Sequence, residues 1–448
     1  MPKKTNKKQD KITILGGGAS GMMAAISAAR VAGGSAVRIV EKNDKLGRKI
    51  LATGNGRCNF TNRLCTPADL LSSLSEIDLA MSVLEGFGVE ETLDFFESIG
   101  IFWREESEGR IYPYSEQASA LQEALLAEVH ALGVEIYNEA SVTHVSPLTY
   151  TEELKPKAIV NEEIQRIDGF EIILEDGRKI FASKLILATG GRAGSQYGST
   201  GDGYKIAQSL GHSVIKPIPA LVQLTVQGKV FQQLKGVRAK GKATLLDQKG
   251  KEIAQDQGEI QFTEGGLSGI CIFNLSRFLR TYENKPVSEL GYSAKLDLIP
   301  DLEEEALVAK LFKRREALQH RKKEEFLYGI VNKKLAPVIL QIARVNPTQH
   351  IANMSEAENK RLAALLKSWI IPISGTKGWR EAQVTSGGVN TAEIHRGTME
   401  SKITHGLYLA GEIIDIDGKC GGYNLQWAWT SGYTAGKCAA EAYSIRSY

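Results

Sequence analysis

Residues 12–21 read ITILGGGASG and form the most informative segment of the chain. The apolar run over 12–15 predicts a short strand, and the Ala-rich run over 22–31 predicts a helix. Between them, Gly16-x-Gly18-x-x-Gly21 has the spacing of a turn that binds a dinucleotide. A second strand is predicted over 36–40, and Glu41 follows it, 20 residues beyond Gly21. Parallel strands joined by a helix predict an α/β fold with a doubly wound sheet.

Each residue type of this segment has a physical reason. Gly16 permits a tight turn, Gly18 lets the backbone approach a pyrophosphate, and Gly21 lets the helix pack close to the strand. The free N–H groups at the start of the helix attract phosphate. Glu41 can accept hydrogen bonds from both ribose hydroxyls and would repel a 2′-phosphate. The alternative is a glycine-rich turn that binds nothing.

Further glycine segments favour FAD over NAD in this site. They follow Glu41 closely at 47–49 and 53–62, and they recur at 187–191, 411–412 and 421–425. Their order along the chain suits a long, bent cofactor better than a purely structural role. We therefore expect FAD to contact Gly16, Gly18, Ala19, Ser20, Gly21, Glu41, Lys42, Arg48, Lys49, Thr53, Gly54, Asn55, Gly56, Arg57, Cys58, Asn59, Val142, Thr189, Gly190, Gly191, Asp202, Gly411, Glu412, Gly421, Gly422, Tyr423, Asn424 and Leu425.

The elements along the chain predict a split first domain. Residues 12–195 and 385–448 are expected to form a Rossmann-like FAD-binding domain that the C-terminal part completes. An antiparallel, β-rich substrate domain is expected over 196–300 and 346–384, with a helical insert over 301–345 and a flexible Lys-rich tail over 1–11. Helices are expected over 322–335, 355–367 and 430–442, among others.

Composition limits the partners of the chain. Its 448 residues correspond to roughly three domains. The net charge is +3, and the Lys-rich tail accounts for the excess, which argues against nucleic acid as a partner. Residues 301–335 hold nine Lys or Arg against seven Asp or Glu, which is typical of a solvated helical surface. One uncharged stretch, residues 12–29, is nearly long enough to span a membrane, but glycines interrupt it, so no membrane partner is expected.

Cysteine usage predicts a cytoplasmic protein without a metal centre. The five cysteines are scattered, no Cys/His group has zinc spacing, and the N-terminus does not resemble a signal peptide. Cys58 precedes the next cysteine, Cys65, by seven residues, which differs from the spacing of flavin disulfide reductases. We therefore interpret Cys58 as a buried thiol beside the cofactor and not as half of a redox pair.

Several of these motifs together resemble a known family. The chain is similar to the BaiN-type NAD(P)/FAD-dependent flavoproteins of bacteria, a three-domain group related to aminoacetone oxidases. The resemblance rests on segments 16–21, 41–42, 47–49, 54–62, 200–203, 265–269, 385–389 and 406–436. It covers almost the whole chain and implies an FAD domain, an inserted β domain and a helical insert within the latter.

The resemblance and the motifs together predict an FAD-dependent oxidoreductase. We expect it to transfer a hydride through the flavin between NAD(P)H and a small organic substrate, with an enone favoured. Because only one dinucleotide fingerprint is present, NAD(P)H is expected as a transient donor. An amine oxidase that uses oxygen, or a regulatory protein that binds a dinucleotide without turnover, remain alternatives. The seven histidines form no cluster, so catalytic residues and the oligomeric state stay unassigned.

Overall fold

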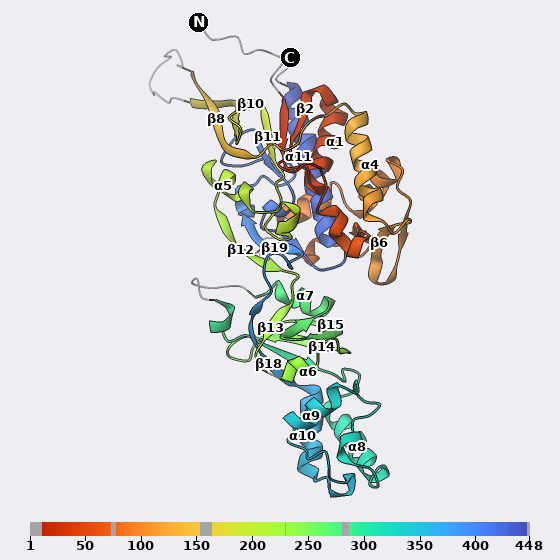
Figure 1. The fold of residues 1–448 in the computed structure, drawn as a ribbon. Helices are drawn as coiled ribbons and strands as arrows, with labels where there is room; N and C mark the ends of the chain where they lie inside the picture. Colours follow the sequence, from red (N-terminus) through yellow and green to blue (C-terminus); the bar gives the residue numbers. More distant parts are fainter. Residues whose placement is uncertain (1–10, 73–77, 153–163, 229, 280–285, 446–448) are drawn as a thin grey trace. The chain divides into compact units, whose positions relative to one another are not determined.

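The chain forms two compact units (Figure 1). The first unit combines Met1–Ile218 with Val384–Tyr448, and the second is the continuous segment Pro219–Gln383. The second unit is thus inserted into the sequence of the first. The computed structural model describes residues 11–72, 78–152, 164–228, 230–279 and 286–445.

A five-stranded parallel sheet organises the first unit. Its strand order is β20-β11-β1-β2-β7, so the first strand of the sequence lies in the middle. Ile12 pairs with Val37 on one side and with Lys184 on the other. All neighbouring pairs are parallel, which confirms the predicted Rossmann-type α/β fold. The bounds are β1 Ile12–Leu15, β2 Val37–Val40, β7 Glu135–Tyr137, β11 Lys184–Leu187 and β20 Leu407–Leu409.

Two helices, α1 (Ala19–Ala32) and α11 (Tyr423–Ile445), pack closely against each other. The close approach requires glycine on α11. A Cβ atom at Gly432 would collide with the backbone of Ser20, and one at Gly436 would collide with the backbone of Ala24. The helix expected over 430–442 is therefore present and extends further at both ends.

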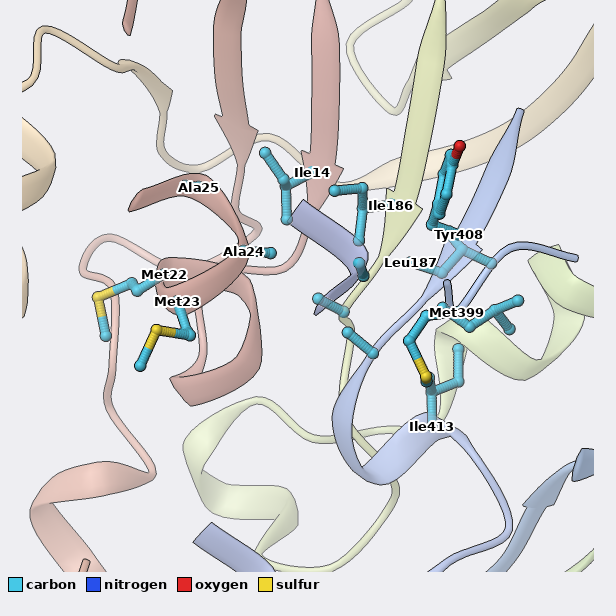
Figure 2. Packing of buried hydrophobic residues seen from close by; sticks show 14 of the residues in the cluster. Ile14, Met22, Met23, Ala24, Ala25, Ile186, Leu187, Met399, Tyr408 and Ile413 are labelled. Carbon is cyan, nitrogen blue, oxygen red and sulfur yellow. The ribbon is translucent and has the colours of Figure 1, made fainter. Parts of the chain in front are cut away.

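The core of the first unit joins the two ends of the chain. Ile14 of β1 and Ile186 of β11 are fully buried, as is Met22 of α1. Figure 2 shows these side chains together with Met399 and Ile413, which come from the C-terminal part of the sequence. The C-terminal residues thus complete a core that the N-terminal strand begins.

Smaller sheets and helices complete the first unit (Figure 1). One three-stranded sheet contains β8 Val142–Glu152, β9 Ile164–Leu174 and β10 Lys179–Ala182, and another contains β3 Thr61–Asn62, β5 Trp103–Glu105 and β6 Arg110–Pro113. Two-stranded sheets pair β4 Leu70–Leu71 with β21 Asp417–Gly418, and β12 Val214–Ala220 with β19 Val384–Val389. The other α-helices of this unit among the described residues are α2 Asp78–Leu84, α3 Val89–Ser98, α4 Ala118–Ala131 and α5 Asp202–Ser209.

A closed antiparallel barrel begins the second unit. Its strand order is β13-β16-β15-β14-β17-β18, and its core stacks the rings of Phe231 and Phe262 on Trp369. The expected antiparallel β region is therefore a barrel. The bounds are β13 Leu224–Val226, β14 Arg238–Leu246, β15 Glu252–Thr263, β16 Gly266–Ser268, β17 Ser293–Asp297 and β18 Trp369–Thr376, with α6 Val230–Gln233 and α7 Ile270–Ser276 as short helices.

Three helices complete the second unit: α8 Glu304–Ala317, α9 Leu335–Ile342 and α10 Glu356–Lys367. Ser355 and Glu358 form the predicted capping box at the start of α10. The helix expected over 322–335 was wrong, because only a short 3-10 turn forms at Lys323–Glu325. The Lys323 side chain is fully buried, and its ammonium lies 2.9 Å from the Glu358 carboxylate. This long-range ion pair overrides the local helical pattern.

Among the described residues, no helix is both long enough and apolar enough to cross a bilayer.

Candidate functional site

The glycine turn between β1 and α1 is shaped by two different requirements. Gly16 has φ +102°, and a Cβ there would lie 2.5 Å from the Ala188 carbonyl oxygen. A Cβ at Gly21 would overlap the carbonyl oxygen of Gly16. A Cβ at Gly18, in contrast, would meet no atom within 4 Å. Packing therefore explains Gly16 and Gly21, whereas Gly18 leaves open space beside the backbone, where a ligand could press closely.

The N-terminus of α1 has no protein cap. Gly18 is the N-cap residue and provides no side-chain hydrogen bond, and the first turn contains no acidic residue. The first N–H groups of a helix have no partner within it and carry partial positive charge. Ala19 and Ser20 thus begin a helix whose end can bind an anion such as a pyrophosphate.

Glu41 lies at the end of β2 and is only 7% exposed. Its Oε2 accepts a hydrogen bond from the backbone amide of Gly17 at 2.7 Å. Its Oε1 accepts from the backbone and side-chain amides of Asn43, at 2.9 and 2.6 Å. A carboxylate has about four acceptor positions, so capacity for a further donor remains. The structure thus places the predicted ribose-binding carboxylate directly against the glycine turn.

The loop over 53–59 has an unusual backbone. Gly54, Asn55, Gly56 and Cys58 all have positive φ angles, of 55°, 55°, 87° and 57°. Asn55 and Cys58 adopt this region without being glycine, and such strain is common in binding and catalytic loops. Arg57 anchors the loop, because its guanidinium stacks on the Tyr112 ring at 4.2 Å and lies 3.0 Å from Glu116.

The Cys58 thiol is fully buried. Burial raises its pKa to about 12, although a hydrogen bond with Thr53 acts in the opposite direction. Burial also raises the pKa of Cys65 to about 12. Both cysteines are free thiols, and both remain protonated at neutral pH. Since the thiolate is the reactive form, this supports the interpretation of Cys58 as an unreactive buried thiol.

Ion pairs connect predicted site residues that are far apart in sequence. Lys42 Nζ lies 2.5 Å from Asp202 Oδ2, and Lys49 Nζ lies 2.6 Å from Glu412 Oε2. Arg48 remains more exposed and donates to Asn43 at 3.2 Å. The segments at 41–49, 202 and 411–412, predicted separately, are thereby brought together.

The strands β11 and β20, which lie on one side of β1, contribute glycine turns to the same edge of the sheet. Thr189, Gly190 and Gly191 follow β11, and Gly411 follows β20. The Ala410 amide donates to Leu187 at 2.9 Å, which holds the two strand ends in register. Ligands of open α/β sheets bind at the carboxyl ends of the strands, so these turns lie where a dinucleotide is expected.

The start of α11 provides the last predicted segment. Gly422 has φ +100°, and a Cβ there would collide with the backbone of Thr61. Tyr423 is the first helical residue, and Leu425 lies in the first turn. The Asn424 side chain holds the preceding turn, because it bonds the amide and the carbonyl of Gly418 at 2.8 and 2.9 Å.

Val142, also predicted, begins β8 and is half-buried. The segment just before Val142 lies beside Glu41, because the Ala140 amide donates to the Glu41 carbonyl at 2.9 Å. No described polar contact assigns Val142 a role beyond packing.

The sequence argument missed three supporting residues. Asn43 holds the Glu41 carboxylate, and Asn62 donates to the Gly421 carbonyl at 2.8 Å. The Thr385 hydroxyl accepts from the amides of Arg192 and Ala193 at 2.8 and 3.1 Å. Asn62 and Thr385 lie within the segments that carry the family resemblance, so the motif pointed to them. Asn43 had no such signal, because its role depends on the turn after β2.

Unpaired polar atoms complete the site. Asn59 Oδ1 and Thr189 Oγ1 are buried and have no hydrogen-bond partner among the described residues. Buried polar atoms are usually paired, so a ligand with hydroxyl or N–H groups would suit these positions. Together with the open space at Gly18 and the uncapped helix α1, these atoms fit a bound dinucleotide.

Comparison with known proteins agrees with this architecture. The 3-dehydro-bile acid delta(4,6)-reductase of Clostridium scindens is 39% identical over 435 residues, which cover 96% of this chain and 99% of that protein. A ribosomal RNA dihydrouridine synthase of Haemophilus influenzae is 32% identical over 94% of this chain and 96% of its own length. The 3-ketosteroid delta1-dehydrogenase of Sterolibacterium denitrificans shares the fold, with a TM-score of 0.50 at 13% identity, over 96% of this chain and 99% of its own.

These relatives bear on the earlier expectations. The predicted resemblance to BaiN-type proteins is confirmed by the near-complete match with the Clostridium scindens reductase. The exclusion of nucleic acid is not supported, because another relative is named for ribosomal RNA. The family model described as "HI0933-like protein Rossmann domain" matches residues 10–438 of this chain. The chain therefore belongs to the HI0933-like family.

Proposed function

We propose that this protein is an FAD-dependent reductase that adds hydrogen across a carbon–carbon double bond conjugated to a carbonyl group, with NAD(P)H as the electron donor. The observation that carries the proposal is the arrangement of Gly18, the uncapped start of α1 and the Glu41 carboxylate at one strand edge. This arrangement matches the pyrophosphate and ribose of a dinucleotide.

The predicted residues would contact different parts of the cofactor. The glycine turn and the first amides of α1 would hold the pyrophosphate, and Glu41 would accept from the ribose hydroxyls. Lys49, Glu412 and the glycine turn at 189–191 would contact the middle of the cofactor. The segment at 421–425 would contact the flavin ring, where the N-terminal end of α11 favours negative charge. When bound, FAD supplies hydride transfer, which no side chain can perform.

The names of the relatives support the type of substrate. A 3-dehydro-bile acid with double bonds at positions 4 and 6, and the uracil ring with its 5,6 double bond, are both activated alkenes next to a carbonyl group. A reductase of one and a dihydrouridine synthase for the other therefore perform the same reaction type. This shared chemistry favours a conjugated alkene as the substrate of the present protein.

The chain's own groups suit such a reduction. Burial raises the pKa of Tyr423 to about 12, so its hydroxyl keeps its proton at neutral pH. Closely packed turns at Gly16 and Gly422 leave the backbone little freedom to move. A rigid site holds cofactor and alkene in fixed positions, which lowers the entropic part of the barrier.

Anaerobic reduction of the purified holoenzyme tests the proposal. We expect NADH or NADPH to bleach the flavin absorbance, and an α,β-unsaturated ketone to restore it without oxygen. If an amine bleaches the flavin while NAD(P)H does not, and air then restores the flavin absorbance with release of peroxide, the protein is an oxidase. A protein that no donor reduces would favour the regulatory alternative. Either result would overturn the proposal.

A further inference from the structure

Charge is unevenly divided between the two units. Residues 219–383 contain 26 Lys or Arg against 18 Asp or Glu, whereas the rest of the chain contains 29 against 34. The small net charge of the whole chain thus conceals a basic second unit. A basic unit attracts polyanions even when the complete protein is nearly neutral.

The excess is concentrated around α9. Residues 313–344 hold nine Lys or Arg and only three Asp or Glu. Three of these cations have internal roles. Arg314 donates to the carbonyls of Phe326 and Tyr328 at 2.7 and 2.6 Å, and Arg315 donates to the Met354 carbonyl at 3.1 Å. The third is Lys323, whose ammonium is buried against Glu358.

The other six cations are exposed and form no ion pair with any carboxylate in the described part of the chain. Some exposed cations elsewhere in the second unit are paired, as Lys235 is with Glu264 at 3.0 Å and Lys360 with Glu356 at 2.7 Å. The distinguishing feature of 313–344 is therefore the local excess of cations over carboxylates. We call the six together with Tyr328 the basic α9 surface. Its members are Lys313, Arg321, Lys322, Tyr328, Lys333, Lys334 and Arg344.

Most of these residues belong to α9 or to the segments next to it in the chain. Helix α9 has eight residues and is therefore about 12 Å long. Lys333 and Lys334 precede it directly, and Arg344 lies just beyond its end. The 3-10 turn Lys323–Glu325, which directly follows Arg321 and Lys322, contacts α9. Figure 1 shows α8, α9 and α10 grouped together beyond the barrel of the second unit.

Two further features indicate a polyanionic ligand. Tyr328 is 40% exposed, and Arg314 donates to its carbonyl, so an exposed ring lies in the same chain segment as Arg321 and Lys322. Arg321 also lies close enough to Arg314 to lower the pKa of Arg314, in addition to the larger effect of burial. Cations that crowd one another gain free energy when an anion binds between them.

From these observations we propose that the basic α9 surface binds the sugar–phosphate backbone of folded RNA. Repeated phosphates match several exposed cations within a short span, and an exposed ring can stack on an unpaired base. A membrane surface fits less well, because membrane-binding helices carry a broad apolar face and the exposed side of α8 is charged. The binding itself is independent of the proposed function.

Fluorescence anisotropy of the full-length holoenzyme with a fluorescein-labelled stem–loop RNA tests the surface. We expect binding that weakens with salt, with a slope in log K of about −0.7 to −0.9 for each phosphate neutralised. The triple variant K322E/K333E/K334E should lose about tenfold or more in affinity. The control K240E/K249E/K251E makes the same charge change on exposed lysines of the same unit and should change affinity by about twofold at most.

Three results would overturn the proposal: no RNA binding by the wild type at low salt, an equal loss in both triple variants, or binding to phosphatidylglycerol vesicles in place of RNA. Reduction of a small α,β-unsaturated ketone is measured in parallel and should be the same in both variants. Wild-type protein that binds RNA but reduces no alkene refutes the proposed function alone. Protein that reduces the ketone but does not bind RNA refutes the surface alone.

Discussion

The carboxylate of Glu41 accepts a hydrogen bond from the backbone amide of Gly17 at 2.7 Å. The end of β2 is thereby tied to the glycine turn that follows β1. Glu41 thus has two functions in the proposed site: it accepts from the ribose, and it fixes the turn that receives the pyrophosphate.

Glu41→Ala should therefore weaken FAD binding by at least about tenfold. Loss of hydrogen bonds to a charged group costs about 1.5–3 kcal/mol, and about 1.4 kcal/mol corresponds to a factor of ten. The dissociation constant of FAD, measured by quenching of flavin fluorescence, checks this. Glu85→Ala, an exposed change in the same unit, serves as the control. An unchanged constant in Glu41→Ala would place the adenosine elsewhere.

Gly18→Val should fold normally and fail to retain FAD. Gly18 has φ −76° and ψ −166°, which any L-residue adopts, and its Cβ position is open. A side chain there would fill only the space that the cofactor needs. Circular dichroism and thermal unfolding of the apo forms should be close to wild type, while bound flavin after purification should be absent. Gly18→Val protein that is yellow would refute the assignment of the turn.

Reductive titration should consume one two-electron equivalent per FAD. Cys58 and Cys65 are free thiols and therefore already reduced, so they take up no electrons, whereas a disulfide would take up two. Burial raises the pKa of both thiols to about 12, which keeps them protonated and disfavours their oxidation to a pair. Anaerobic titration with dithionite, followed by flavin absorbance, measures the stoichiometry. Cys65→Ser should give the same value. Uptake of a second equivalent that Cys65→Ser abolishes would show a redox-active pair.

The buried ion pair of the second unit should make that unit sensitive to acid. Burial acts to raise the pKa of Glu358, but hydrogen bonds from Lys323 and Ser355 outweigh it and hold the pKa below the usual 4.5. A lowered carboxyl pKa adds stability that is complete above about 4.5 and is lost as pH falls through the folded-state value.

Lys323→Met should destabilise the second unit by about 1.5–3 kcal/mol at neutral pH, since the partly buried Glu358 carboxylate loses its cation and keeps only the hydrogen bond from the Ser355 amide. It should also remove the acid sensitivity that depends on the pair. Amide hydrogen exchange in α8, α9 and α10 across a pH series measures both effects. Lys323→Met/Glu358→Gln retains an acceptor for the capping box and should recover part of the stability. Equal acid sensitivity in wild type and Lys323→Met would refute the role of the pair.

Local patterns predicted the first unit well. The spacing of Gly16, Gly18 and Gly21 and the place of Glu41 depend on geometry within one βαβ segment, and the structure retains that geometry. Contacts between distant residues were not predictable in this way. The bonds of Asn62 with Gly421 and of Lys49 with Glu412 join segments more than 300 residues apart, and no local pattern encodes them.

The errors in the second unit have physical causes. The spacing of residues over 322–335 predicts a helix only if Lys323 lies on the surface. The structure instead buries the Lys323 side chain against Glu358. The charge of 301–335 looked balanced because the acidic run from Asp301 to Glu305 offset the cations after residue 312. The net charge of the whole segment 301–335 therefore concealed an acidic beginning and a basic remainder.

The contact of α1 with α11 has a consequence for the order in which the protein folds during synthesis. Pro219–Gln383 is continuous, so all contacts within that unit become available while the C-terminal residues are still being translated. The first unit requires β20 and α11, which leave the ribosome only after the inserted unit. Until then, the glycines of α11 cannot cover Ser20 and Ala24, and the apolar surface of α1 stays uncovered. During synthesis the contacts within the inserted unit can therefore form before the contacts that cover α1.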